Sequence, residues 1–340
     1  MSPEPLNTST LQTLAERVVP VAAGDHVVHA AFLGREACFA LSDGTAVFAE
    51  IGEERRVSLF ADAGLLCAAS SRTLLVAGGE DGRIMRLTAT GEVSEIGNAQ
   101  GKWIDAIALA PSGAAAWSAG KTAYARDDKG GLKSFAAPSS IRGLGFAPKG
   151  YRVAVSHYNG VSFWFPNTAA APEFYEWKGS HLDVTLSPDG RFIVTSMQEN
   201  TLHGWSVADK KHMRMAGYPS KTRSFSWSAD GNWLATSGAD AAIVWPFQSK
   251  DGPMGKAPRE CGIRAAKISQ VAFHPKALVL AMGYEDGCVL LCRLTDGSEL
   301  LVRRAIEGSG ITALAWDASG ARMAFGAEDG AAGILTLPAG

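Results

Sequence analysis

Short apolar runs alternate with turns along almost the whole chain, and one arrangement of them returns eight times. Each unit begins with an apolar run that ends in a large residue, passes a turn into a second run, and reaches a third through a turn that often carries Asp-Gly or Asn-Gly. These dipeptides favour tight hairpins because they accept positive φ. A fourth run follows in most units, as at 57–60 and 300–303. The pattern predicts an all-β chain built from four-stranded repeats.

Two columns of residues support the alignment of the units. With the turn position that is proline in the clearest copies (Pro111, Pro148, Pro188) as a reference, the residue two places before it is bulky in seven of the eight units. The residue three places before it is small in all eight units: Ala31, Ala68, Ala108, Gly145, Thr185, Ser226, Ala272 and Ala315. A small residue facing a large one lets neighbouring units pack closely where their first strands converge on an axis.

Repetition of four-stranded units at roughly 40 residues predicts a closed β-propeller. We expect eight blades, with seven as the alternative if one early unit is degenerate. The last unit ends with its third strand, at 333–337, so we expect residues 17–21 to supply its outer strand and close the ring. Pro20 suits an edge strand, where a missing N–H donor is tolerated. The expected domains are an N-terminal tail with a short helix, 1–16, and one propeller, 17–338.

The composition excludes several classes of protein. The 340 residues carry a formal net charge of -2, so the chain lacks the excess of positive charge that is typical of nucleic-acid-binding proteins. No apolar run reaches the length of a membrane span, and the N-terminus lacks the features of a secretory signal. Cysteines are odd in number and sit in apolar positions, which favours a reducing compartment. We therefore expect a cytoplasmic protein that is monomeric on its own and binds neither nucleic acid nor membrane.

The clearest units resemble the WD repeat. One first strand ends Leu-Ser-Pro-Asp-Gly at 186–190, and the sixth unit continues Leu-Ala-Thr-Ser at 234–237 before Asp240 and a third strand that closes on Trp245. The resemblance covers nearly the whole chain, and 180–253 is similar to cytoplasmic bacterial members of the family. No unit ends its third strand with the Trp-Asp dipeptide. The family's His–Asp–Ser/Thr–Trp hydrogen-bond network is therefore expected to be mostly absent, with Thr236, Asp240 and Trp245 coming nearest to it.

The resemblance implies a rigid disc that presents loops to a protein partner. Loops leading into each unit and turns between its second and third strands should share one face, and the channel mouth there should hold Asp105 beside two arginines, a set that suits an acidic or peptide ligand. Aromatic and arginine side chains dominate binding hot spots because they bury much area and still bond at their polar ends. The candidate partner contacts are Trp103, Arg142, Tyr158, His181, Arg223 and Tyr284.

No catalytic motif, Cys-x-x-Cys pair or phosphate-binding loop occurs in the sequence, so the leading prediction is a non-catalytic interaction scaffold without a cofactor. One alternative is an accessory protein in zinc homeostasis. It rests on His157 and His181 in adjacent loops, with Glu199 as a third ligand, and on an association of the family with bacterial metal homeostasis. A further alternative is a propeller hydrolase or lactonase, but the channel columns offer Ala, Gly, Ser and Thr instead of carboxylates and histidines.

Overall fold

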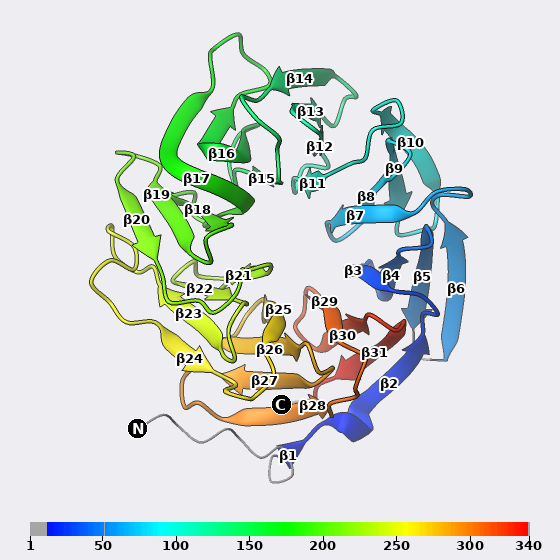
Figure 1. Ribbon diagram of the computed structural model, residues 1–340. Coiled ribbons are helices and arrows are strands. Elements are labelled where there is room, and N and C mark those ends of the chain that lie inside the picture. Colours follow the sequence, from blue (N-terminus) through cyan, green and yellow to red (C-terminus); the bar gives the residue numbers. More distant parts are fainter. Residues whose placement is uncertain (1–11, 51, 339–340) are drawn as a thin grey trace.

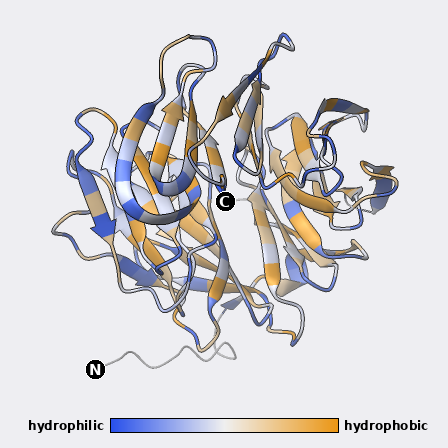
Figure 2. Cartoon of the chain, turned by 45° about the horizontal axis from the view of Figure 1, so that its top comes forward, coloured by the Kyte–Doolittle hydropathy of each residue, from blue (hydrophilic) through white to orange (hydrophobic). Residues whose placement is uncertain are grey.

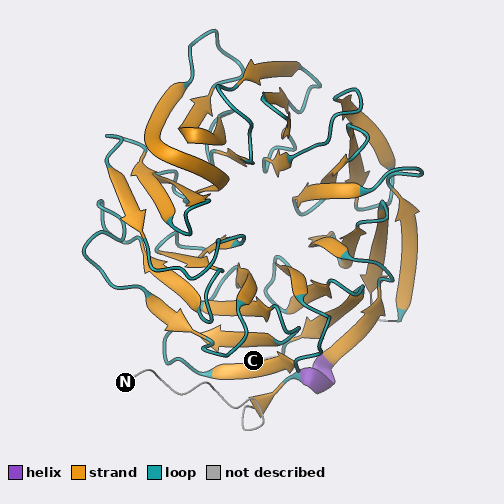
Figure 3. Ribbon diagram, viewed as in Figure 1, coloured by secondary structure: helices purple, strands orange, loops and turns teal. Residues whose placement is uncertain are grey.

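The computed structural model describes residues 12–50 and 52–338. Its strands form sheets, antiparallel in all but one strand pair, that stand around a common axis like the blades of a fan (Figure 1). In most sheets the first strand in the chain lies nearest the axis and the next strands follow outward. The described residues contain a single short helix, the 3-10 turn η2 (Ala15–Arg17) (Figure 3). No helix in this part of the chain is long and apolar enough to cross a membrane.

Sheets I to III contain four strands each. Sheet I consists of β3 (Val27–Leu33), β4 (Glu36–Leu41), β5 (Thr45–Glu50) and β6 (Glu53–Ser58). Sheet II consists of β7 (Leu65–Ser70), β8 (Leu74–Gly79), β9 (Arg83–Thr88) and β10 (Val93–Asn98). Sheet III consists of β11 (Ala106–Leu109), β12 (Ala115–Ala119), β13 (Thr122–Arg126) and β14 (Leu132–Ala136).

Sheet IV has six strands and corrects the predicted number of blades. It consists of β15 (Gly143–Phe146), β16 (Val153–Trp164), β17 (Glu173–Leu186), β18 (Phe192–Met197), β19 (Leu202–Ser206) and β20 (His212–Met215). With each hydrogen-bonded sheet counted as one blade, the ring has seven blades, and the prediction of eight was wrong. The alternative prediction of seven blades is therefore right, but its stated reason is not, because both early units form complete four-stranded sheets.

The cause is a segment that stays extended between the fourth and fifth sequence units. On β17, Ser180 pairs with Tyr158 of β16, and the next residue, His181, pairs with Met197 of β18. Strand β17 therefore pairs with β16 along its first part and with β18 along its last part. The expected turn at Asn159 is present within β16: Asn159 and Gly160 both have positive φ, and the His157 ring lies 2.8 Å from the Ser162 hydroxyl on the other side of the turn.

Sheets V to VII complete the ring. Sheet V consists of β21 (Phe225–Trp227), β22 (Trp233–Thr236), β23 (Ala242–Pro246) and β24 (Arg259–Cys261). Sheet VI consists of β25 (Ile268–Phe273), β26 (Val279–Tyr284), β27 (Val289–Arg293) and β28 (Glu299–Arg303), with β1 (Gln12–Thr13) at its outer edge. Sheet VII consists of β29 (Ile311–Trp316), β30 (Arg322–Ala327), β31 (Ala331–Thr336) and β2 (Val18–Ala22).

The N-terminal strand closes the ring as the sequence predicts. Strand β2 pairs antiparallel with β31 in an unbroken register from Val18 opposite Leu335 to Ala22 opposite Ala331. Pro20 lies opposite Gly333 on this outermost strand. The innermost strands at the same junction are joined by the Thr312 hydroxyl, which donates to the Val27 carbonyl at 2.6 Å. The expected tail helix lies partly outside the described residues; of 12–16, two residues form β1 and the rest lead into or begin η2.

The apolar core lies between adjacent sheets, and the turns and loops are mostly hydrophilic (Figure 2). The bulky and the small residues that recur at fixed positions of the sequence units contact each other in this core. Trp227 of sheet V donates its indole N–H to Thr185 Oγ1 of sheet IV at 3.0 Å, and Trp316 of sheet VII donates to the Ala272 carbonyl of sheet VI at 3.1 Å. The bulky residue of one sheet thus lies over the small residue of its neighbour, which explains the small-residue column.

Replacing Ala108 with leucine is expected to destabilise the protein by about 1–3 kcal/mol through overpacking. Ala108 is buried between sheets III and IV in a cluster with Ile141 and Val153, where extra methyl groups have no free space. Urea unfolding measures the change. Ala170→Leu is the control, because Ala170 is exposed in the loop before β17 and its replacement should change stability by less than about 0.5 kcal/mol. Equal losses at both positions would contradict the packing role of the column.

Candidate functional site

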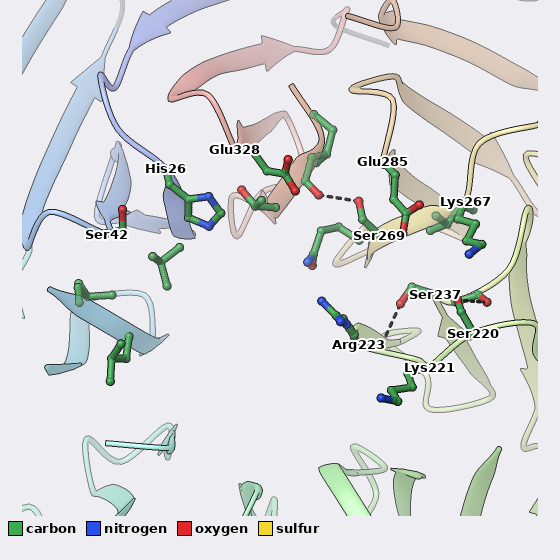
Figure 4. A pocket seen from close by; sticks show the side chains of 18 residues that line it. His26, Ser42, Ser220, Lys221, Arg223, Ser237, Lys267, Ser269, Glu285 and Glu328 are labelled. Atoms are coloured by element: carbon green, nitrogen blue, oxygen red, sulfur yellow. Dashed lines mark hydrogen bonds between the residues drawn. The ribbon is translucent and has the colours of Figure 1, made fainter. Parts of the chain in front are cut away.

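A cavity of about 750 Å³ opens at one end of the channel (Figure 4). Its wall is made by loops that lead into sheets, at His26 and Lys267, and by turns between second and third strands, at Ser42, Glu285 and Glu328. The two kinds of loop thus share one face at these sheets, as the sequence predicts. We call this face, with its cavity, the channel mouth.

Bulges in the innermost strands aim side chains into this cavity. The register of β3, β7, β25 and β29 shifts at the same level of each strand, which leaves one residue without a cross-strand partner: Val28, Leu66, Ser269 and Thr312. All four line the cavity. The Ser269 hydroxyl donates to the Ile311 carbonyl of the next sheet at 2.5 Å, so the wall is tied from sheet to sheet (Figure 4). A β-bulge re-aims a side chain in this way by inserting one residue into a strand.

Both signs of charge line the cavity. Lys221, Arg223 and Lys267 supply cations, and Glu285 and Glu328 supply carboxylates (Figure 4). None of the five takes part in an ion pair with another described residue within 4.0 Å. Charged groups without an internal partner remain available to a ligand, and this arrangement suits a peptide that carries both signs.

A smaller cavity of about 170 Å³ continues the channel wall beside sheets II to IV and holds Asp105, Arg142 and Asp183. Arg142 Nη1 lies 3.9 Å from Asp105 Oδ1, and its side chain is 59% exposed, so this pair is weak. The channel solvent still reaches Asp183, but burial raises the pKa of its carboxyl to about 6, opposed by Arg142 and Arg223. Sequence reasoning missed Asp183, which reaches the channel because the register of β17 shifts between His181 and Val184.

Large apolar side chains are exposed on the same face. Trp103 is 65% exposed in the loop leading into sheet III, and Tyr158 is 52% exposed beside the bulge of β16. Two residues that sequence reasoning missed join them, Ile306 in the loop leading into sheet VII and Leu66 at the bulge of β7. A loop position such as that of Ile306 and a bulge position such as that of Leu66 give no periodic signal in the sequence, so only the structure finds them.

Two candidate partner contacts do not reach the surface. His181 is fully buried: its Nδ1 lies 2.7 Å from Thr195 Oγ1 and its Nε2 lies 2.9 Å from the Trp177 carbonyl. Tyr284 is also fully buried and donates to the Gly262 carbonyl at 2.5 Å. Each side chain faces an adjacent strand or sheet, because it belongs to an inner or second strand and not to a loop tip. Neither is placed to contact a partner.

The proposed zinc ligands hold different positions. His157 is buried, with Nε2 2.8 Å from Ser162 Oγ and Nδ1 2.9 Å from the Tyr158 carbonyl, whereas Glu199 is exposed. Burial lowers the pKa of His157 and of His181, so both rings are neutral at neutral pH. Both nitrogens of each ring are engaged within the chain. In residues 12–50 and 52–338 no group of three or more His, Cys, Asp or Glu is arranged to hold a metal ion, and the zinc site stays an untested prediction.

Sheet V carries a buried hydrogen-bond network that differs from the expected one. Trp245 donates its indole N–H to the Tyr218 hydroxyl at 2.6 Å, and that hydroxyl lies 2.7 Å from Thr236 Oγ1. Tyr218, from the loop after β20, therefore takes the place expected for Asp240. Its position in an irregular loop gave no signal in the sequence. The network ties this loop to the second and third strands of the sheet.

Seven sheets around one axis, with a loop-built mouth, define the protein as a β-propeller. Its fold is similar to that of the computationally designed Ika8 protein, with a TM-score of 0.76 and 18% identity over 92% of this chain and 97% of the other. Residues 211–245 match the family "WD domain, G-beta repeat", and residues 271–340 match "Anaphase-promoting complex subunit 4 WD40 domain".

A stretch of 77 residues is 34% identical to WD repeat-containing protein 1-B of Xenopus laevis, and it covers 22% of this chain and 13% of that relative. The matched stretch thus spans a small part of the relative's length. The matches and the fold together support a WD40 β-propeller.

Proposed function

We propose that this protein is a non-catalytic scaffold that binds a protein partner at its channel mouth, with Trp103, Arg142, Tyr158 and Arg223 as contacts. WD40 propellers are typically protein-interaction scaffolds, which supports the class of function. The proposal places the protein in the bacterial cytoplasm, on the resemblance of 180–253 to cytoplasmic bacterial propellers and on five free thiols. It is expected to be a monomer before the partner binds.

The gathering of exposed apolar side chains around a charged cavity carries the proposal. Seven large hydrophobic residues are exposed in the described part of the chain, and four of them lie on the mouth face: Leu66, Trp103, Tyr158 and Ile306. Water penalises such side chains, and exposed apolar patches rimmed by polar groups mark interaction sites. A partner that covers them would also meet Arg142 and Arg223, which carry charge into the interface.

Alanine at Trp103 or Arg223 is expected to weaken partner capture tenfold or more, or roughly 1.4 kcal/mol. Each side chain is exposed, so its removal should leave the melting temperature unchanged. The measurement compares proteins captured by wild-type and variant baits from cytoplasmic extract, by quantitative mass spectrometry. The partner is the protein whose yield falls with both variants, and its affinity is then measured with purified components.

Lys250→Ala and Lys256→Ala provide the matched controls. Both lysines are exposed on the loop between β23 and β24, which emerges on the face opposite the mouth. Their removal should leave capture of the same protein unchanged. A partner whose binding depends on these lysines and not on Trp103 or Arg223 would show that the opposite face is the working surface.

A further inference from the structure

Three of the five cysteines face the interface between sheets V and VI. Cys261 ends β24, the outermost strand of sheet V, while Cys288 and Cys292 belong to the third-strand region of sheet VI. All three belong to one hydrophobic cluster that contains residues of both sheets. Cys261 and Cys292 lie beside each other there, because Gly262, the residue after Cys261, is hydrogen-bonded to Glu299, the cross-strand neighbour of Cys292. Two thiols that are distant in the sequence thus meet between two blades.

Backbone pairing holds this contact in place. Cys292 pairs across the β27–β28 ladder with Glu299. The Glu299 carboxylate in turn accepts a hydrogen bond at 2.9 Å from the N–H of Gly262, the residue that follows Cys261. The Tyr284 hydroxyl donates to the carbonyl of the same glycine. The residue that follows Cys261 is therefore fastened to sheet VI by two hydrogen bonds, which hold the end of β24 against Cys292.

The two thiols differ in access and in acidity. Cys261 is 8% exposed on its outer strand, whereas Cys292 is 2% exposed and Cys288 is fully buried. The neighbouring Cys292 thiol lowers the pKa of Cys261, and the Cys261 thiol raises that of Cys292. Burial raises the pKa of Cys38 and Cys67 to about 12. A thiolate is the reactive form of cysteine, so among the three thiols of this interface an oxidant meets its best target at Cys261.

We propose that Cys261 and Cys292 form a site of reversible oxidation by hydroperoxides, at which a disulfide joins sheet V to sheet VI. The Cys261 thiolate attacks a peroxide oxygen, the O–O bond breaks, and a sulfenic acid and an alcohol (water, for hydrogen peroxide) are formed. The Cys292 sulfur then attacks the sulfenic sulfur, the S–O bond breaks, and water leaves with the second thiol proton. One hydroperoxide is reduced for each disulfide formed, and a dithiol reductant reverses the modification.

The crosslink would fix two sheets that both supply charge to the channel mouth. Arg223 comes just before β21 of sheet V, and Lys267 comes just before β25 of sheet VI. The site itself depends only on the packing of the two sheets. It is therefore independent of whether the mouth binds a partner.

The test treats the purified protein with one equivalent of hydrogen peroxide, blocks the remaining thiols by alkylation, and maps peptides without reduction. We expect a crosslinked peptide pair containing Cys261 and Cys292, with Cys38, Cys67 and Cys288 alkylated. Cys288→Ser should retain the crosslink, because the residue tied to the Cys261–Gly262 segment through Glu299 is Cys292. Cys292→Ser should instead leave a sulfenic acid at Cys261, which a diketone reagent traps, and Cys261→Ser should leave none at Cys292.

A second measurement uses the wild-type protein alone and does not depend on the folding of a variant. Oxidation should raise its melting temperature, and dithiothreitol should restore the original value, because a crosslink restricts the unfolded chain. Wild-type protein whose Cys261 remains alkylated after peroxide, or which forms the crosslink through Cys288, would overturn the proposal. A disulfide between two molecules in place of the internal one would overturn it as well.

Discussion

Deletion of residues 1–22 is expected to leave the protein largely unfolded or aggregated. The deletion removes β2 and with it the ladder from Val18–Leu335 to Ala22–Ala331, and it strips the buried Val21 from the core between sheets VII and I. The lost hydrogen bonds and apolar contacts amount to about 5 kcal/mol or more. Domains of this kind have a total stability of about 5–15 kcal/mol, so the loss is a large fraction of it. The bare edge of β31 would also offer unpaired backbone groups to other chains.

Size-exclusion chromatography and thermal unfolding measure both consequences. The control deletes residues 1–11 only, which leaves every residue of β1, η2 and β2 in place. This shorter deletion should elute as the full chain does and keep its melting temperature. If the protein without residues 1–22 were also monomeric and equally stable, closure of the ring by the N-terminal strand would not be needed for the fold.

Replacing Gly143 with alanine is expected to destabilise the protein by about 3 kcal/mol, at the upper end for an overpacked site. A Cβ atom at this position would lie 2.7 Å from the Leu182 carbonyl oxygen and 2.8 Å from the Asp183 Cα. Both are backbone atoms of β17, the strand shared by the two halves of sheet IV, and they cannot turn aside as a side chain does. The sheet must shift to admit one methyl group, and chemical denaturation measures the cost.

Gly145→Ala is the matched control, two residues further along the same strand. A Cβ atom there would meet the terminal Cδ1 of Leu186 at 2.9 Å, with the nearest backbone atom at 3.4 Å. A leucine methyl group moves by a small rotation of the side chain, so the expected loss is below about 1 kcal/mol. Equal losses for the two variants would show that β17 shifts easily and that the shared strand is not rigid.

The mouth residues were only partly predictable from the sequence. Trp103 and Tyr158 are exposed as their positions in a loop and a turn suggest, because polar backbone in such segments lies at the surface. The sequence suggested a loop position for His181. In the structure it lies in strand β17, where it pairs with Met197 of β18, and its ring is hydrogen-bonded to Thr195 in the core. Asp183 lies in the mouth only because the strand register shifts there, and no spacing rule in the sequence marks that shift.

The sequence by itself determined the all-β class, the repeated unit, the small-residue column and the closing strand at 17–21. These features depend on the alternation of apolar and polar residues and on turn residues, and both influence only the few residues next to them in the chain. The tertiary structure alone decided that the fourth and fifth units share one sheet, that Tyr218 bonds Trp245, and that Cys261 lies beside Cys292. Each of these depends on contacts between segments of different units, whose distance and orientation follow from packing and leave no periodic trace in the chain.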